Sequence, residues 1–323
     1  MLDRVNLFSN FRSFGGAMPQ LDRPSHQFMQ DRLRASYRYC ERIARSQARN
    51  FYYSFVALPP EQRAAMCAVY AFMRYSDDVS DEAVITDRFD AIQSWRAALD
   101  RALDGDYGDS LILPAFHDTV CRYRIPAQFF YELIEGTAMD LTHTRYETWD
   151  DLYLYCYRVA SVVGFVCLYI WGFDAAEGKA LRYAEACGIA FQLTNILRDI
   201  GEDYDRGRIY LPQEDMRRFC VSEADIGSRS LSKAFQALMR FEVERARSYY
   251  AEAKKLLPLL SKEAQPTFAI MYRIYRGILD AIERNNYDVF SRRARVSTWR
   301  KVRYVLEAWV RQHRSLELDK EKE

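Results

Sequence analysis

Residues 192–212 read QLTNILRDIGEDYDRGRIYLP, a stretch that begins like a buried helix and then becomes polar at regular spacing. Asn195, Asp199 and Asp203 are four residues apart, so on a helix they stack on one face in a row roughly 12 Å long. Such a row repels itself unless a positive charge binds to it. Mg²⁺ prefers oxygen ligands of this kind, with substrate phosphate completing its shell. A solvated acidic helix face is the alternative for this stretch alone.

A second acidic cluster has the pattern DDxxD and contains Asp77, Asp78 and Asp81. Asp77 and Asp81 lie one helical turn apart on one face, and Arg74 precedes them by one turn. This pattern alone is a weak signal, because acidic residues often occur at helix ends. Two acidic helix faces in one chain, each with an arginine close by, indicate the two walls of a cavity that binds a diphosphate through metal ions.

The rest of the chain reads as one helix after another. Alternating strand patterns are absent from the sequence, and no linker rich in Gly, Pro or Ser divides it. We therefore predict a single all-α domain over residues 31–314, a loose arm at 1–30, a charged tail at 315–323 and a short irregular hairpin near 208–211. Within the domain, Pro59 and Pro60 predict the start of one helix, and another is expected over residues 175–200, ending at Gly201. The most apolar run, residues 159–171, is shorter than the about 20 residues that a membrane-spanning helix needs, which predicts a core helix.

Composition narrows the class of protein. The net charge of +1 gives no overall attraction for nucleic acid or for an anionic membrane. Seven cysteines without a CxxC pair predict reduced, buried thiols and a cytoplasmic location, and the four scattered histidines do not form an HExxH metal motif. The 23 Tyr and 19 Phe could shield a hydrocarbon chain and stabilise a carbocation through their ring faces, although most could equally be ordinary core residues.

Five segments together resemble the squalene/phytoene synthase family. They are FYYSFVALPPEQRAAMCAVYAFMRYSDDVSDE (51–82), LIEGTAMDL (133–141), YCYRVASVVG (155–164), the stretch at 192–212, and YDVFSRR (287–293). The resemblance implies a trans-isoprenoid diphosphate synthase domain, an all-α helical bundle with a central cavity. It also implies that two identical allylic diphosphates condense head to head through a cyclopropyl diphosphate.

The resemblance also assigns roles to individual residues. The metal ligands it implies, for Mg²⁺ or alternatively Mn²⁺, are Asp77, Asp81, Asn195, Asp199 and Asp203. The catalytic residues it implies are the same four aspartates with Tyr155 and Tyr210. The substrate-binding residues it implies are Arg74, Arg198, Gln192, Asn195, Phe51, Tyr70, Val159, Val163, Gly164 and Arg49. Released diphosphate or Tyr210 would accept the proton that is lost when the cyclopropane ring closes.

The length of the substrate stays open at this point. A twenty-carbon diphosphate, giving phytoene, is preferred, and a fifteen-carbon one, giving presqualene diphosphate, squalene or dehydrosqualene, is the alternative. NADPH would be needed only for squalene. A head-to-tail prenyl elongase or terpene cyclase fits less well with the Tyr-Leu-Pro at 210–212, and a non-catalytic helical scaffold is a remoter alternative. The expected partners are isoprenoid diphosphates, not nucleic acid, with peripheral membrane contact for product release left open.

Overall fold

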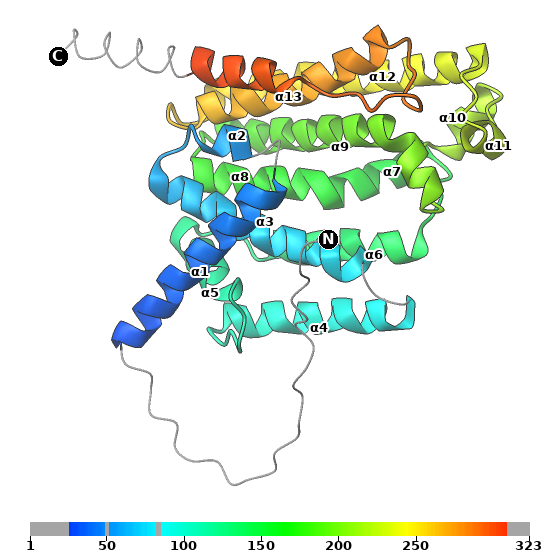
Figure 1. Ribbon diagram of the computed structural model, residues 1–323. Coiled ribbons are helices and arrows are strands. Elements are labelled where there is room, and N and C mark those ends of the chain that lie inside the picture. Colours follow the sequence, from blue (N-terminus) through cyan, green and yellow to red (C-terminus); the bar gives the residue numbers. More distant parts are fainter. Residues whose placement is uncertain (1–25, 49–51, 82–84, 309–323) are drawn as a thin grey trace, which may run out of the picture.

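The structure, a computed structural model, describes residues 26–48, 52–81 and 85–308, and within these ranges nearly all regular structure is helical (Figure 1). The first half contains α1 (His26–Gln47), α2 (Tyr52–Phe55), α3 (Pro60–Asp81), α4 (Ile85–Leu103), α5 (Leu113–Tyr123), α6 (Gln128–Thr142), α7 (Trp149–Cys156), η1 (Tyr157–Ser161) and α8 (Val162–Trp171). The second half contains η2 (Ala176–Gly178), α9 (Lys179–Asp205), α10 (Gln213–Arg218), α11 (Glu223–Gly227), α12 (Lys233–Ala253), η3 (Lys254–Leu259) and α13 (Gln265–Arg284). A last helical stretch covers residues 298–308. The predicted all-α fold is confirmed.

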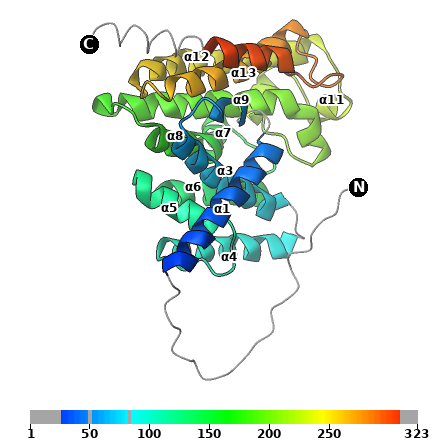
Figure 2. The same ribbon diagram turned by 60° about the vertical axis from the view of Figure 1, so that its left-hand side comes forward.

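The helices form successive layers. Figures 1 and 2 show α4 at one end of the molecule, then α6, the rod made by α7 and α8, then α9, and finally α12 and α13. The helix contacts follow this order: α6 packs against α4, α3 and α8, whereas α9 packs against α8, α12 and α13. Because α8 contacts both α3 and α9, it connects the two helices that carry the acidic clusters.

Local sequence explains several helix starts. Pro60 is the first residue of α3 and Glu61 lies in its first turn, as the sequence predicts, because proline has no amide hydrogen to lose there and an acidic group favours the positive end of the helix dipole. At the start of α7, Thr148 and Asp151 form a capping box in which each side chain accepts the other's backbone N–H.

The rod of α7 and α8 contains one π-helical turn, η1, between them. This turn packs tightly against α9. A Cβ atom on Gly188 of α9 would lie 2.4 Å from the Cα of Ser161, so only glycine allows this approach. Ser161 also donates a hydrogen bond of 2.9 Å to the carbonyl of Glu185. The whole rod, Trp149–Trp171, is long and apolar enough to cross a membrane, but 56% of its apolar window is buried inside the protein, as expected for a core helix.

The core is rich in aromatic rings, and the chain's thiols are mostly buried. Phe72 of α3 stacks on Phe116 of α5, with ring centroids 4.1 Å apart.

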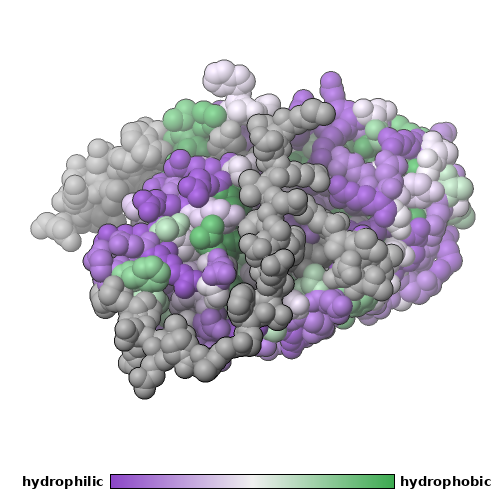
Figure 3. Space-filling view, turned by 60° about the horizontal axis from the view of Figure 1, so that its bottom comes forward, coloured by the Kyte–Doolittle hydropathy of each residue, from purple (hydrophilic) through white to green (hydrophobic). Residues whose placement is uncertain are grey.

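All seven cysteines are free, as predicted, but Cys121 and Cys220 are exposed rather than buried. Hydrophilic side chains cover much of the face drawn in Figure 3, and the hydrophobic residues on it are scattered.

Three boundaries differ from the sequence prediction. The first helix begins at His26, so residues 26–30 of the expected arm are helical; the rest of the arm and the tail at 315–323 lie outside the described residues. Helix α9 continues beyond Gly201 to Asp205, which places both aspartates of the row on it. Residues 208–211 do not form a hairpin: Ile209 pairs instead with Arg145, and its N–H donates to the carbonyl of Thr144 at 2.9 Å.

Candidate active site

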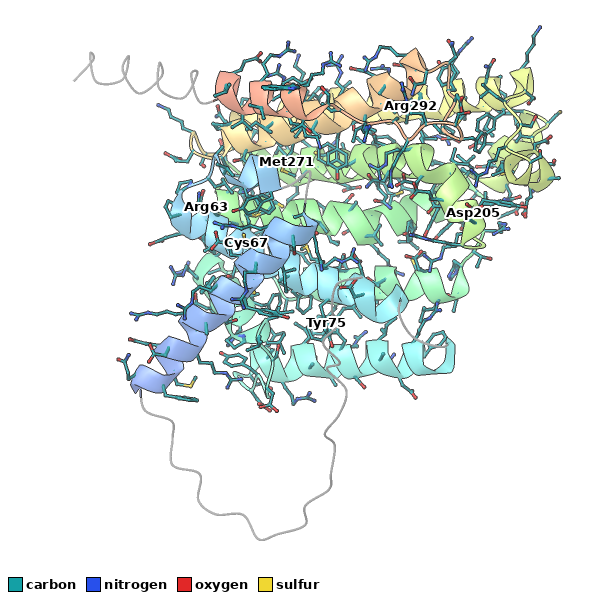
Figure 4. The ribbon with its side chains drawn as sticks, in the orientation of Figure 1. Arg63, Cys67, Tyr75, Asp205, Met271 and Arg292 are labelled. Carbon is teal, nitrogen blue, oxygen red and sulfur yellow. The ribbon has the colours of Figure 1, made fainter. Side chains whose placement is uncertain are left out.

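The acidic row on α9 is anchored by two arginines. Asp199 accepts hydrogen bonds from the neighbouring Arg198, and Arg293 approaches its carboxylate to 2.8 Å from a segment that follows α13. Arg293 also lies 2.9 Å from Glu202 on the next turn of α9. Figure 4 labels the adjacent Arg292, on the segment that passes above α9 in that view. The sequence prediction included Arg198 but missed Arg293, although the YDVFSRR segment contains it.

The first part of the row carries amides. Asn195 donates a hydrogen bond of 3.3 Å to Gln192, one turn earlier on α9. Both side chains are partly buried. The structure thus places Gln192, Asn195 and Asp199 on one face of α9, as their spacing predicts.

Asp203, at the far end of the row, lies where its ionised form is disfavoured. Burial is the largest effect and raises the pKa of its carboxyl to about 7, with the charges of Asp199 and Asp140 acting in the same direction. Arg206 and Arg208 act against this shift. Asp203, Arg208 and Tyr210 share one small pocket at this end of α9.

Two tyrosines and an aspartate meet beside this pocket. The hydroxyl of Tyr210 donates to Asp140 at 2.8 Å, and the hydroxyl of Tyr155 donates to the other oxygen of the same carboxylate at 3.2 Å. Their rings stack with centroids 5.1 Å apart. Burial, followed by the charge of Asp140, raises the pKa of both phenols. The two tyrosines are therefore neutral donors at neutral pH.

Asp140 was not assigned from the sequence. It lies near the end of α6, whereas Tyr155 comes from α7 and Tyr210 from the extended segment after α9. The pairing of Ile209 with Arg145 fixes that segment next to α6 and so brings Tyr210 to Asp140. In the sequence, Asp140 is a single aspartate near the end of the apolar helix segment LIEGTAMDL. Such a residue does not by itself predict a partner.

The acidic cluster on α3 is described in part. Arg74 forms an ion pair with Asp78, one turn later, and the side chain of Asp77 is exposed. Asp81 ends α3, but its side chain lies outside the described part of the structure. Burial raises the pKa of Tyr70, one turn before Arg74, to about 12.

A buried tyrosine connects the two acidic helices. Tyr275 of α13 stacks on Phe191 of α9 with a centroid distance of 4.3 Å. Burial is the main cause of its raised pKa, and Arg198, Tyr70 and Asp199 all act on it electrostatically. Groups on both α3 and α9 therefore act electrostatically on the same buried phenol. Sequence reasoning missed Tyr275, because nothing in the sequence relates α13 to the aspartate motifs.

The expected hydrocarbon lining is only partly visible. Val159 and Val163 are half-buried on η1 and α8. Gly164 faces the packing seam between α8 and α9, since a Cβ there would lie 3.1 Å from the carbonyl oxygen of Ala184. Arg49 and Phe51 lie outside the described residues, so the central cavity stays a prediction.

The acidic residues could supply some, but not all, of the ligands of a hard cation such as Mg²⁺. Among the described residues, no three His, Cys, Asp or Glu side chains converge closely enough to form a metal site by themselves. The carboxylates are oxygen ligands. Burial is the main cause of the raised pKa of Asp203, with Asp199 and Asp140 adding to it, and a bound cation would favour the ionised form of this carboxyl. The remaining ligand positions would have to come from water and substrate phosphate, as is usual for Mg²⁺.

Comparison with known proteins agrees with this picture. A 15-cis-phytoene synthase from Synechococcus elongatus is 40% identical over 283 residues, which cover 84% of this chain and 91% of that protein. A 15-cis-phytoene synthase from Synechocystis is 38% identical over 287 residues, which cover 85% of this chain and 85% of that protein. Among solved structures, a dehydrosqualene synthase aligns with a TM-score of 0.80 at 29% identity, covering 87% of this chain and 98% of its own. A squalene synthase from Alicyclobacillus acidocaldarius aligns with a TM-score of 0.74 at 31% identity, covering 79% of this chain and 96% of its own.

The layered helices and the similarity to solved dehydrosqualene and squalene synthases define an all-α prenyltransferase. The sequence profile of the squalene/phytoene synthase family matches residues 44–300, and the chain belongs to that family. Its members join two prenyl diphosphates head to head and use divalent metal to bind the diphosphate groups. The sequence-based identification of the family and of the reaction type is confirmed.

Proposed function

We propose that this chain is a phytoene synthase that condenses two molecules of geranylgeranyl diphosphate. The observation that carries this choice is the identity of 36–40% to relatives named phytoene synthase, which exceeds the 29–31% identity to the solved dehydrosqualene and squalene synthases. Residues 31–314 form the trans-isoprenoid diphosphate synthase domain in this proposal.

Two sets of side chains bind the diphosphates in the proposed mechanism. Arg74 on α3, together with Arg198 and Arg293 beside α9, supplies planar donors that match phosphate oxygens. The side chains that would hold Mg²⁺, with Mn²⁺ as the alternative, are the carboxylates of Asp77, Asp81, Asp199 and Asp203 and the amide oxygen of Asn195. The bound cation would neutralise the negative charge that develops on the leaving diphosphate.

The aromatic side chains serve the allylic cation. Phe191 and Tyr275 form a buried stack next to Gln192 of α9, and we assign Tyr70 of α3 to the same role. Their ring faces can stabilise positive charge on carbon. Tyr155 and Tyr210 are neutral phenols that already donate to Asp140. Because its raised pKa keeps Tyr210 protonated at neutral pH, released diphosphate, rather than Tyr210, accepts the proton lost at ring closure.

Product analysis tests the proposal. The purified chain is incubated with Mg²⁺ and a single allylic diphosphate, either geranylgeranyl or farnesyl, with and without NADPH and without isopentenyl diphosphate. We expect phytoene from the twenty-carbon substrate and no dependence on NADPH. Dehydrosqualene or squalene as the dominant product would transfer the assignment to the fifteen-carbon alternative. No symmetric product from either substrate would refute the head-to-head reaction for this chain.

We also propose that the enzyme contacts membranes peripherally to release its hydrocarbon product. Trp299, in the last described helical stretch, is 84% exposed, and Leu306 is 58% exposed. Residues 291–306 contain six basic residues and no acidic one. An exposed tryptophan among basic residues suits the headgroup region of an anionic bilayer. Flotation with phosphatidylglycerol vesicles should be weakened by Trp299→Ala and not by Leu111→Ser, which removes a side chain 54% exposed elsewhere; equal flotation of both variants would refute the contact.

A further inference from the structure

A hydrogen-bonded cluster of three side chains, none of them in the candidate active site, lies at the end of α5. Cys121 Sγ is 3.1 Å from Nε2 of His117, one turn earlier on the same helix. The other ring nitrogen, Nδ1, is 2.8 Å from the hydroxyl of Tyr107, in the loop before α5. Cys121 is exposed, so a reagent in solution can reach its sulfur.

This arrangement has the parts of an activated thiol: a nucleophile, a base within hydrogen-bond reach and a third group that orients the base. With the proton of the imidazole on Nδ1 and donated to Tyr107, Nε2 carries the lone pair that accepts the thiol proton. The guanidinium of Arg32, on α1, lies 5.6 Å from the centroid of the tyrosine ring. The last turn of α5 disfavours a thiolate by its dipole, so the imidazole is the group that must supply the activation.

The other thiols lack this setting. Five of the seven cysteines are buried. Cys220 is exposed like Cys121, but within the described residues its thiol has no hydrogen-bond partner. The chain therefore carries one exposed thiol with a base beside it and one exposed thiol without, which makes Cys220 an internal reference.

We propose that Cys121 is a modification site that forms mixed disulfides with low-molecular-weight disulfides. His117 takes the proton from Sγ, and the thiolate attacks one sulfur of the reagent. The reagent's S–S bond breaks as the new S–S bond to Cys121 forms, and the departing thiolate takes the proton from the imidazolium. One disulfide and one thiol enter the step, and one mixed disulfide and one thiol leave it. This site does not depend on the proposed function.

The test measures adduct formation at each cysteine. The full-length reduced chain is incubated with oxidised glutathione, and the rates at Cys121 and Cys220 are followed by peptide mass spectrometry. We expect Cys121 to react about tenfold faster than Cys220. His117→Ala should lower the rate at Cys121 to about that of Cys220, and Tyr107→Phe should lower it by a smaller factor. His143→Ala, which removes an exposed histidine outside this cluster, should change neither rate.

Two controls separate activation from a general loss of structure. The rate at Cys220 must stay constant in every variant, and the thermal midpoint of His117→Ala must stay near that of the unmodified chain. If His117→Ala unfolds the protein, Tyr107→Phe, which removes only one oxygen atom, carries the test. Equal rates at Cys121 and Cys220 in the unmodified chain would overturn the proposal, as would a rate at Cys121 that neither variant changes.

Discussion

A buried charge cluster gives the chain a stability that depends on pH. Arg245 of α12 lies 2.7 Å from Glu242 on the same helix and 2.8 Å from Asp215 of α10. Its guanidinium also lies 4.4 Å from the ring centroid of Trp149, at the start of α7. Glu242 and Asp215 are almost fully buried. Two carboxylates therefore share one guanidinium, and the cluster has a net charge of −1 when both are ionised.

Burial, the largest effect, together with Asp215, raises the pKa of Glu242 from 4.5 to about 7. The folded state thus binds this proton more tightly than the unfolded state. The stability that Glu242 contributes is fully present below pH 4.5 and is lost as the pH rises through 7. At about 1.4 kcal/mol for each pKa unit, the shift corresponds to at most about 3 kcal/mol, and we expect about 2 kcal/mol because the three groups share charge.

The substitution Glu242→Gln isolates this effect, because glutamine resembles the protonated acid. In urea unfolding at pH 5 the variant and the unmodified chain should have similar free energies of unfolding. At pH 8.5 the variant should be more stable by about 2 kcal/mol. Glu244→Gln, at an exposed position on the same helix, should show no such change with pH. A stability difference for Glu242→Gln that is the same at both pH values, or a variant less stable at pH 8.5, would refute the reasoning.

Three further substitutions test other parts of the structure. Asp199→Ala should reduce turnover at least about 100-fold while the helical circular dichroism is retained, and retained activity would contradict the proposed role of this carboxylate. Asp140→Asn weakens an acceptor shared by two phenols, so kcat should fall about tenfold or more with a smaller change in KM; an unchanged kcat would show that the acceptor has no role in the reaction. Gly188→Ala forces a Cβ into the backbone of η1, so the chain should lose on the order of 3 kcal/mol of stability in urea unfolding, and a loss below about 1 kcal/mol would mean that the two helices separate easily.

The sequence predicts what depends on local spacing. The face formed by Asn195 and Asp199 follows from helical periodicity, and the start of α3 follows from Pro60. The boundary near Gly201 was wrong because a glycine often ends a helix. Here α9 continues. Among the described residues, the atoms nearest to a Cβ at that position are two ring carbons of Phe290, at 3.4 and 4.0 Å.

The residues that the sequence did not assign depend on contacts between distant segments. Arg293 reaches Asp199 only because the segment after α13 returns across α9. Tyr275 and Asp140 receive their partners from three different helices and one extended segment. No spacing rule relates such residues, because tertiary packing rather than periodicity determines where these segments meet.

The π turn between α7 and α8 sets the rotational phase of the rod. Such a turn accommodates one residue more than an α turn, so the helix beyond it is rotated by about 100° relative to an uninterrupted helix. Tyr155 lies before the turn and faces Asp140, whereas Gly164 lies after it and faces α9. Deleting Ala160, within the turn, would allow α7 and α8 to form one regular α-helix. Either Tyr155 would then turn away from Asp140, or Gly164 would turn away from α9. A length change of one residue is therefore harder to accommodate here than in the loops that join the layers.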